Sequence, residues 1–66
     1  MCLSTVYINH ENINEEVMKD VARIEAEGAG FVLINLFGEK KFIEGKITTI
    51  DLVEDHSVIF EKPKEG

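Results

Sequence analysis

Cysteine, proline and tryptophan are nearly missing from this chain of 66 residues, which contains one cysteine, one proline and no tryptophan. The single cysteine, Cys2, excludes an internal disulfide and a Cys-x-x-Cys metal motif, and it fits a reducing compartment. Long apolar runs are also missing, so we predict no membrane span. The opening residues lack the basic start and the apolar region of a secretion signal. We therefore expect a cytoplasmic protein.

The charge is unbalanced, because 13 acidic residues stand against 7 basic ones and give a net charge of -6. Such a surface favours solubility and repels phosphate backbones. The length allows one domain, which we predict over 1–62, followed by a polar tail over 63–66. A domain of this size buries only about 60% of the surface that its unfolded chain exposes, so its stability is marginal. A dimer or a bound metal is the natural supplement.

Short segments rich in strand-forming residues predict an all-β domain. The expected strands are residues 3–8, 20–27, 31–36, 41–44, 46–53 and 57–61. The expected turns are residues 9–14, 28–30, 37–39 and 54–56, with a bend at Gly45. Five or six short strands in so few residues predict a closed or nearly closed small barrel, which hides its strand edges.

The segment 15–27 is ambiguous. Apolar residues recur at helical spacing from Val17 to Ile24, and glutamates at the start of the segment suit a helix N-terminus. The same segment also alternates like a strand over 21–26. The local pattern alone slightly favours a helix, whereas the surrounding strands favour a strand over 20–27 after one helical turn.

No group of residues predicts catalysis. The two histidines, His10 and His56, stand beside turn or acidic residues, and no Ser-His-Asp or Cys-His arrangement can be argued from the sequence. The glycines punctuate hairpins and form no phosphate loop. We therefore expect a protein that is not an enzyme. We interpret His10 and His56 as turn residues, with a role as an extra metal donor as the alternative.

The start of the chain, Met1-Cys2, is where the sequence suggests metal chemistry. The terminal amine, the amide nitrogen of Cys2 and its thiolate can reach one ion through two fused five-membered chelate rings. Planar nitrogen and sulfur donors of this kind suit Ni(II) and also Cu(II). A symmetric dimer would bring two Cys2 thiolates together. The simpler interpretation is that Cys2 is a small hydrophobic residue that opens the first strand.

Three lysines give a nucleic-acid hypothesis. Lys40, Lys41 and Lys46 lie near Phe37 and Phe42 in the sequence. Small barrels bind single strands by stacking bases on aromatic side chains in a basic groove. Here glutamates interrupt the lysines, and the two aromatics fall at core-like positions. We therefore prefer a solvated face above a core, and RNA binding is the alternative.

Four segments of the chain resemble the CooT family of small nickel-binding proteins. Some members serve carbon monoxide dehydrogenase, and members were earlier catalogued as predicted RNA-binding proteins. The segments are Met1-Cys2-Leu3, Val21-Ala22-Arg23-Ile24-Glu25, Leu36-Phe37-Gly38-Glu39, and Glu44-Gly45-Lys46-Ile47 leading into Ile50-Asp51-Leu52-Val53. Their order and spacing cover nearly the whole chain.

The resemblance implies a small SH3-like antiparallel β-barrel of five to seven strands, a strand over 20–27, and a homodimer. It also implies a Ni(II) site in which Cys2 is the essential ligand, here with Met1 beside it. The expected function is a nickel-binding accessory or delivery protein whose partner is a nickel enzyme such as carbon monoxide dehydrogenase. Two other functions stay open, namely an RNA-binding module and a dimeric scaffold without a ligand, in which Cys2 only packs.

Overall fold

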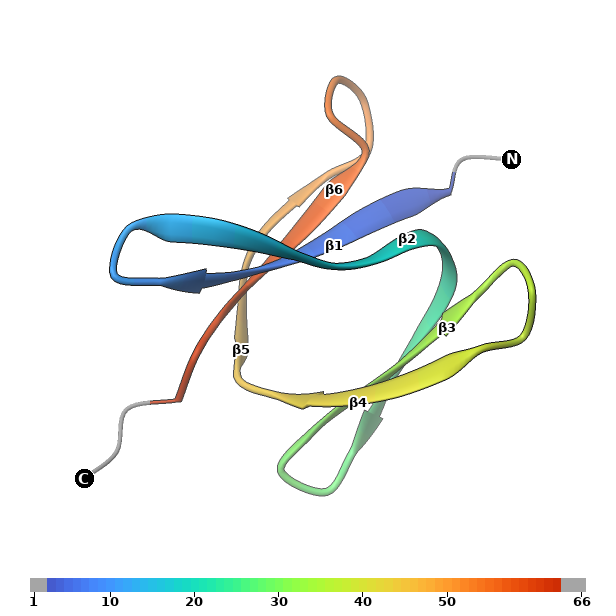
Figure 1. The fold of residues 1–66 in the computed structure, drawn as a ribbon, viewed down its shortest axis with the longest axis horizontal. Coiled ribbons are helices and arrows are strands. Elements are labelled where there is room, and N and C mark those ends of the chain that lie inside the picture. Colours follow the sequence, from blue (N-terminus) through green and yellow to red (C-terminus); the bar gives the residue numbers. More distant parts are fainter. Residues whose placement is uncertain (1–2, 64–66) are drawn as a thin grey trace.

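The computed structural model describes residues 3–63, which form a single six-stranded sheet (Figure 1). The strands are β1 (Ser4–His10), β2 (Ile13–Glu27), β3 (Gly30–Asn35), β4 (Lys40–Glu44), β5 (Lys46–Asp51) and β6 (Ser57–Glu61). Their order in the sheet is β4-β3-β2-β1-β6-β5, and all neighbours are antiparallel except β1 and β6. The predicted all-β class is confirmed. The described part of the chain holds no helix with the length and apolar character needed to cross a membrane.

Strand β2 is long enough to serve two neighbours. Its first half pairs with β1 and its second half with β3, and the register of each ladder slips near Val21. Asp20 takes a φ of 55° at this bend, a conformation that aspartate tolerates better than most residues. The expected strand over 20–27 is therefore confirmed. The helical turn expected before it was wrong, because pairing with β1 packs Val17 and Met18 against the core as part of a strand.

The turn between β1 and β2 is shorter than the polar composition of 9–14 suggested. Only Glu11 and Asn12 lie outside the strands, and their φ values of 53° and 65° are both positive, as a type I′ hairpin turn requires. The strand expected over 3–8 therefore extends to His10. Further along the chain, β5 ends at Asp51, two residues before the expected end of this strand.

The core lies on one face of a strongly curled sheet. Its buried apolar side chains are Val6, Val21, Leu33, Ile43, Val58 and Phe60. The rings of Phe31 in β3 and Phe60 in β6 are 5.2 Å apart and inclined by 58°. Two strands separate β3 from β6 in the sheet, so a flat sheet would hold these strands about 14 Å apart. The sheet therefore bends around to enclose its own core.

Gly45 stands between β4 and β5, the two strands at opposite ends of the sheet order. Its φ of 148° favours glycine, and a Cβ at this position would collide with the backbone oxygen of Glu61. Figure 1 shows the chain turning a corner here. Within residues 3–63 no hydrogen-bonded ladder joins β4 to β5. The sheet is therefore curled but not closed, and the expected closed barrel is not formed by hydrogen bonds.

The corner gives a direct test of the fold. We expect Gly45→Ala to lower the free energy of unfolding by about 1–3 kcal/mol, because the new Cβ meets backbone in a conformation that only glycine adopts easily. Gly38→Ala is the matched control, since Gly38 also has a positive φ, 83°, but open space around it. Urea unfolding followed by circular dichroism measures both. Equal losses for the two variants would contradict a steric role for Gly45.

Candidate functional site

One row of paired residues crosses the sheet at the point where β1 begins. From β3 to β1 the paired residues are Asn35, Val21 and Ser4, and from β1 to β5 they are Thr5, which follows Ser4 in the chain, Ser57 and Asp51. We call this edge the N-terminal end of the sheet. In Figure 1 the start of β1 and the β3–β4 turn lie at the right, and the β5–β6 loop lies at the top. The ends of strands that are far apart in the sequence therefore lie at the same end of the sheet as the start of β1.

Polar and apolar residues exchange their usual places at the N-terminal end. The buried polar side chains among the described residues all lie in the row, and they are Ser4, Asn35 and Ser57. Immediately beyond the row, four large apolar side chains are exposed, with exposed fractions of 57% for Leu36, 76% for Phe37, 57% for Leu52 and 85% for Val53. We call these four residues the apolar rim. Leu36 and Phe37 follow β3 whereas Leu52 and Val53 follow β5, and three strands separate these two in the sheet order, so the rim consists of two exposed apolar pairs at the same end of the sheet.

Asn35 fixes one half of the apolar rim. Its Oδ1 accepts hydrogen bonds from the backbone N–H groups of Phe37, at 3.0 Å, and Glu39, at 2.9 Å, and its Nδ2 donates to Glu39 Oε1 at 2.7 Å. The backbone N–H of Leu36 donates to the carbonyl oxygen of Asp20 at 2.8 Å. Leu36 and Phe37 are therefore held outward by a turn whose polar groups are bonded within the fold.

Asp51 fixes the other half in the same way. Its Oδ1 accepts hydrogen bonds from the backbone N–H groups of Glu54, at 3.0 Å, and Val53, at 3.1 Å. These two bonds hold the pKa of the Asp51 carboxyl below its ordinary value, and the bond from Glu54 has the larger effect. An Asn or Asp that ends a strand and bonds the next backbone amides is a common turn device. Both apolar pairs thus follow a side chain that caps their turn.

The two histidines lie at opposite ends of β1. His56 precedes β6 with a φ of 48°, it is half-buried, and its carbonyl oxygen accepts a hydrogen bond from the N–H of Thr5 at 2.9 Å. His56 therefore belongs to the N-terminal end. His10 closes β1, about 20 Å further along the strand at 3.3 Å per residue. The structure therefore does not bring the two histidines together, and only the backbone of His56 lies beside the start of β1.

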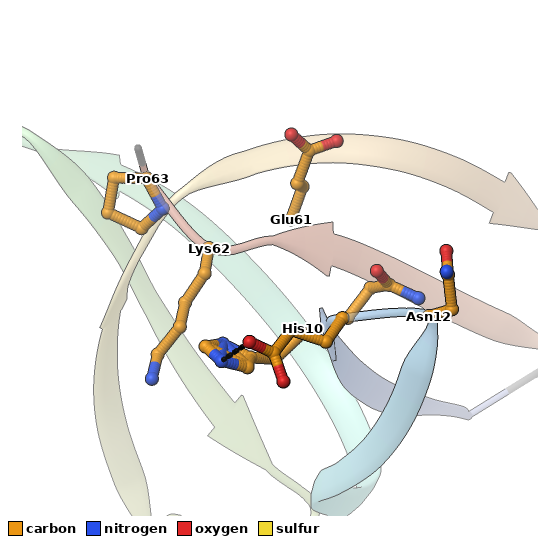
Figure 2. Close-up of a pocket in the computed structure, with 7 residues that line it drawn as sticks. His10, Asn12, Glu61, Lys62 and Pro63 are labelled. Carbon is orange, nitrogen blue, oxygen red and sulfur yellow. Dashed lines mark ion pairs between the residues drawn. The ribbon is translucent and has the colours of Figure 1, made fainter. Parts of the chain in front are cut away.

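Figure 2 shows the surroundings of His10, an open depression between the β1–β2 turn and the chain that follows β6. The imidazole Nε2 of His10 lies 3.8 Å from the carboxylate of Glu11, and both side chains are largely exposed. Glu61 and Lys62 complete a wall of mixed charge. An exposed ion pair of this kind contributes little to stability and does not build a binding site.

The predicted metal ligands, Met1 and Cys2, lie outside the described residues. Within residues 3–63 no three His, Cys, Asp or Glu side chains come close enough together to hold a metal ion. A complete metal site would therefore need donors from the start of the chain or from a second copy.

The lysines of the nucleic-acid hypothesis do not form one group. Lys40 and Lys41 of β4 line a shallow depression that also contains acidic side chains, namely Glu16, Asp20 and Glu39. Lys46 of β5 lines a different depression, which contains Glu61. The two aromatics expected at core-like positions are instead exposed, Phe37 by 76% and Phe42 by 52%. That expectation was wrong, and Phe37 instead belongs to the apolar rim.

Sequence reasoning missed the capping residues and the apolar rim. The available signal was small: in each case an Asn or Asp that ends an apolar strand is followed by two large apolar residues, Leu36-Phe37 and Leu52-Val53. In the sequence these pairs look like the continuation of a buried strand. Only the register shows that both pairs lie beyond the same row of the sheet.

Three comparisons with known proteins agree with this architecture. The family described as CO dehydrogenase accessory protein CooT matches residues 1–61. An uncharacterised protein of Methanocaldococcus jannaschii is 42% identical over 55 residues, which cover 83% of this chain and 90% of that protein. The crystal structure of a protein from Carboxydothermus hydrogenoformans assigned to CooT has a TM-score of 0.87 at 28% identity, covering 96% of this chain and 100% of that one. The family match includes Cys2, the row and the apolar rim.

Removing the cap at Asn35 tests how the rim is held. We expect Asn35→Ala to lower the free energy of unfolding by about 2–3 kcal/mol, because two backbone N–H groups in a part-buried turn lose their acceptor and Glu39 loses its donor. Asn9→Ala is the control, since it removes only one exposed hydrogen bond, to Asn14, and should cost about 0.5 kcal/mol or less. Urea unfolding of both variants measures the difference. A loss at Asn35 no greater than that at Asn9 would show that the cap does not hold the turn.

Proposed function

Because this chain belongs to the CooT family of CO dehydrogenase accessory proteins, we propose that it binds Ni(II) through Cys2 at a homodimer interface. Its role is to hold or deliver the ion, and its partner is a nickel enzyme such as carbon monoxide dehydrogenase. The observation that carries the proposal is the apolar rim around the end of the sheet from which Cys2 emerges.

The donor chemistry suits nickel. The thiolate of Cys2, its amide nitrogen and the amino nitrogen of Met1 form two fused chelate rings in one plane, which is the geometry that Ni(II) and Cu(II) prefer. Copper binds such donors more tightly than nickel, so metal supply in the cell and the partner enzyme would decide which ion is carried. The net charge of -6 favours the approach of a cation.

The position of β1 keeps this site close to the N-terminal end. Two residues of chain reach at most about 7 Å, so an ion held by Cys2 stays near the buried Ser4. The half-buried His56, whose backbone is bonded to Thr5, is within the same region and is our proposed source of a further nitrogen donor. His10 is too distant for this role.

The apolar rim supports a homodimer. A two-fold axis near the N-terminal end would bury Leu36, Phe37, Leu52 and Val53 of each copy and bring two Cys2 thiolates to one place. Burial of these side chains would also supplement the small core of a chain this short. Metal binding and dimerisation are therefore one proposal, in which the rim positions the ligands.

We also propose that the curled sheet is an SH3-like barrel in which Gly45 forms the corner between β4 and β5. The contact between Phe31 and Phe60 supports this proposal, because it joins strands from opposite halves of the sheet order. A cytoplasmic location remains part of the proposal, since Ni(II) binding by a thiolate requires a reduced cysteine.

Nickel titration of Cys2 variants tests the proposed site. In the wild-type protein we expect Ni(II) to produce thiolate-to-metal charge-transfer absorption in the near ultraviolet. Cys2→Ser should remove this band and weaken binding by about a hundredfold or more, because the thiolate is the soft, charged donor. His10→Ala is the control and should bind like the wild type.

His56→Ala in the same titration separates the proposed further donor from the essential one. It should weaken Ni(II) binding by about 10–100-fold without removing the charge-transfer band, since Cys2 is retained. Equal affinity of wild type and Cys2→Ser would overturn the proposed function.

A further inference from the structure

A hollow of 290 Å³ lies where the β5–β6 loop, at the top of Figure 1, meets the outer face of the sheet. Residues of β1, β2, β6 and this loop line it, and they are Tyr7, Asn14, Asp55, Ser57 and Ile59. Tyr7 lies opposite Ile59 in the ladder between β1 and β6. Ser57 and Ile59 alternate in β6 with two buried core residues, so they turn to the opposite face. The hollow therefore faces away from the core, and it shares no residue with the apolar rim.

The hydroxyl of Ser57 is available to a ligand in this hollow. The exposed fraction of Ser57 is only 6%, although the residue stands on the outer face. Among residues 3–63 its hydroxyl makes no hydrogen bond. In the same part of the chain, every fully buried polar side-chain atom has a partner. The Ser57 hydroxyl is therefore not sealed in, and it reaches the opening where a bound group can meet it.

The wall formed by Asp55 is held in place by backbone bonds on both of its sides. Before Asp55, the N–H of Glu54 donates to Asp51 Oδ1 at 3.0 Å. After it, the carbonyl oxygen of His56 accepts a hydrogen bond from the N–H of Thr5 at 2.9 Å. The positive φ of His56, 48°, turns the chain from the loop into β6. The Asp55 carboxylate is therefore presented by a loop that is bonded at both ends.

The lining of the hollow offers hydrogen-bond acceptors and holds no basic side chain. Asp55 supplies a carboxylate, and Tyr7 and Ser57 supply hydroxyls. Asn14 supplies an amide oxygen, which accepts one hydrogen bond from Asn9 Nδ2 at 2.7 Å and has a second lone pair. The net charge of the chain is -6, which attracts cations. A ligand that matches this lining carries positive charge and donates hydrogen bonds.

The shape of the lining favours a guanidinium group over other cations. A metal ion needs several strong ligands, and within residues 3–63 no three His, Cys, Asp or Glu side chains come together. An ammonium group is strongly hydrated and makes little use of the apolar walls that Tyr7 and Ile59 provide. A guanidinium is planar and weakly hydrated, stacks on aromatic rings, and donates a fork of N–H groups to a carboxylate.

We propose that this hollow binds the guanidinium group of an arginine side chain from a different protein. Pockets that enclose whole small molecules have volumes of about 300–1,000 Å³, so an open hollow of 290 Å³ suits one side chain better than a complete metabolite. The arginine of this chain, Arg23, is already paired with Glu25 at 3.1 Å, which makes a second copy a poor donor. The inference goes beyond the proposed nickel function and does not depend on it.

Titration with blocked amino acids tests the chemistry of the hollow. The probes are the N-acetyl amides of arginine, lysine and citrulline, because citrulline has the shape of arginine without its charge. Amide chemical shifts of the ¹⁵N-labelled full chain, without nickel, report the affinity. We expect the arginine probe to shift the amides of Ser57 and Ile59 and to bind about threefold more tightly than lysine and about fivefold more tightly than citrulline. Equal affinity for the three probes would overturn the proposal.

Two variants of neighbouring acidic residues locate the site. Asp55→Asn should weaken binding of the arginine probe about fivefold, because it removes the carboxylate and keeps the shape. Glu54→Gln is the matched control, since it removes the same charge from the same loop but Glu54 does not line the hollow, and it should weaken binding less than about twofold. Both positions are exposed, so both variants should fold. Equal losses would show that diffuse charge, not the hollow, attracts the probe.

Free arginine distinguishes a protein partner from a small molecule. The blocked probe resembles an arginine within a protein, and it should bind at least as tightly as free arginine. Tighter binding of free arginine by about tenfold would overturn the assignment to a protein side chain. Because these titrations contain no nickel, a missing response to arginine would remove this inference and leave the nickel function standing. Equal nickel affinity of wild type and Cys2→Ser would remove the nickel function alone.

Discussion

The packing of Phe31 against Phe60 is the contact on which the rest of the fold depends. Among residues 3–63 no helix or second sheet covers the six strands, so the sheet bends until its own strands cover one another. The bend needs special backbone at a few positions: Asp20 with positive φ in the middle of β2, Gly45 between β4 and β5, and the bulge at Thr48. These positions are local deviations from regular strand geometry, and each one allows the sheet to curl.

Curling has a consequence for the surface. The register places the ends of β3 and β5 at the same end of the sheet as the start of β1, although these strands are far apart in the sequence. At this end the fold buries serine and asparagine and exposes leucine, phenylalanine and valine. Asn35 and Asp51 hold the exposed apolar pairs in place through hydrogen bonds to backbone amides. In the proposed function, these exposed apolar pairs at the end of the sheet where β1 begins bring the Met1-Cys2 dipeptides of two copies together.

The strands from residue 31 onward could be predicted because short runs rich in Val, Leu and Ile alternate with turns that contain glycine. The start of β2 could not, because Val17 and Met18 also fit a helix and only pairing with β1 decides between the two. Cys2 could be proposed as a ligand from its place beside the terminal amine together with the family resemblance, because its place alone also fits a packing role. The residues near Cys2 could not be predicted from the sequence. The position of Phe37 depends on the hydrogen bonds that Asn35 makes to the residues after it. The position of His56 depends on the parallel pairing of β1 with β6.

The central claim of the proposed function is that Cys2 and the apolar rim form one shared nickel site. Native mass spectrometry of the intact protein tests this claim most directly, because it reports chain number, nickel content and retention of Met1 together. We predict that nickel is found on assemblies of two or more chains, and that Phe37→Ser, which removes the most exposed aromatic of the rim, gives smaller assemblies that retain little nickel. Nickel bound equally well to single chains of the wild-type protein and of Phe37→Ser would contradict it.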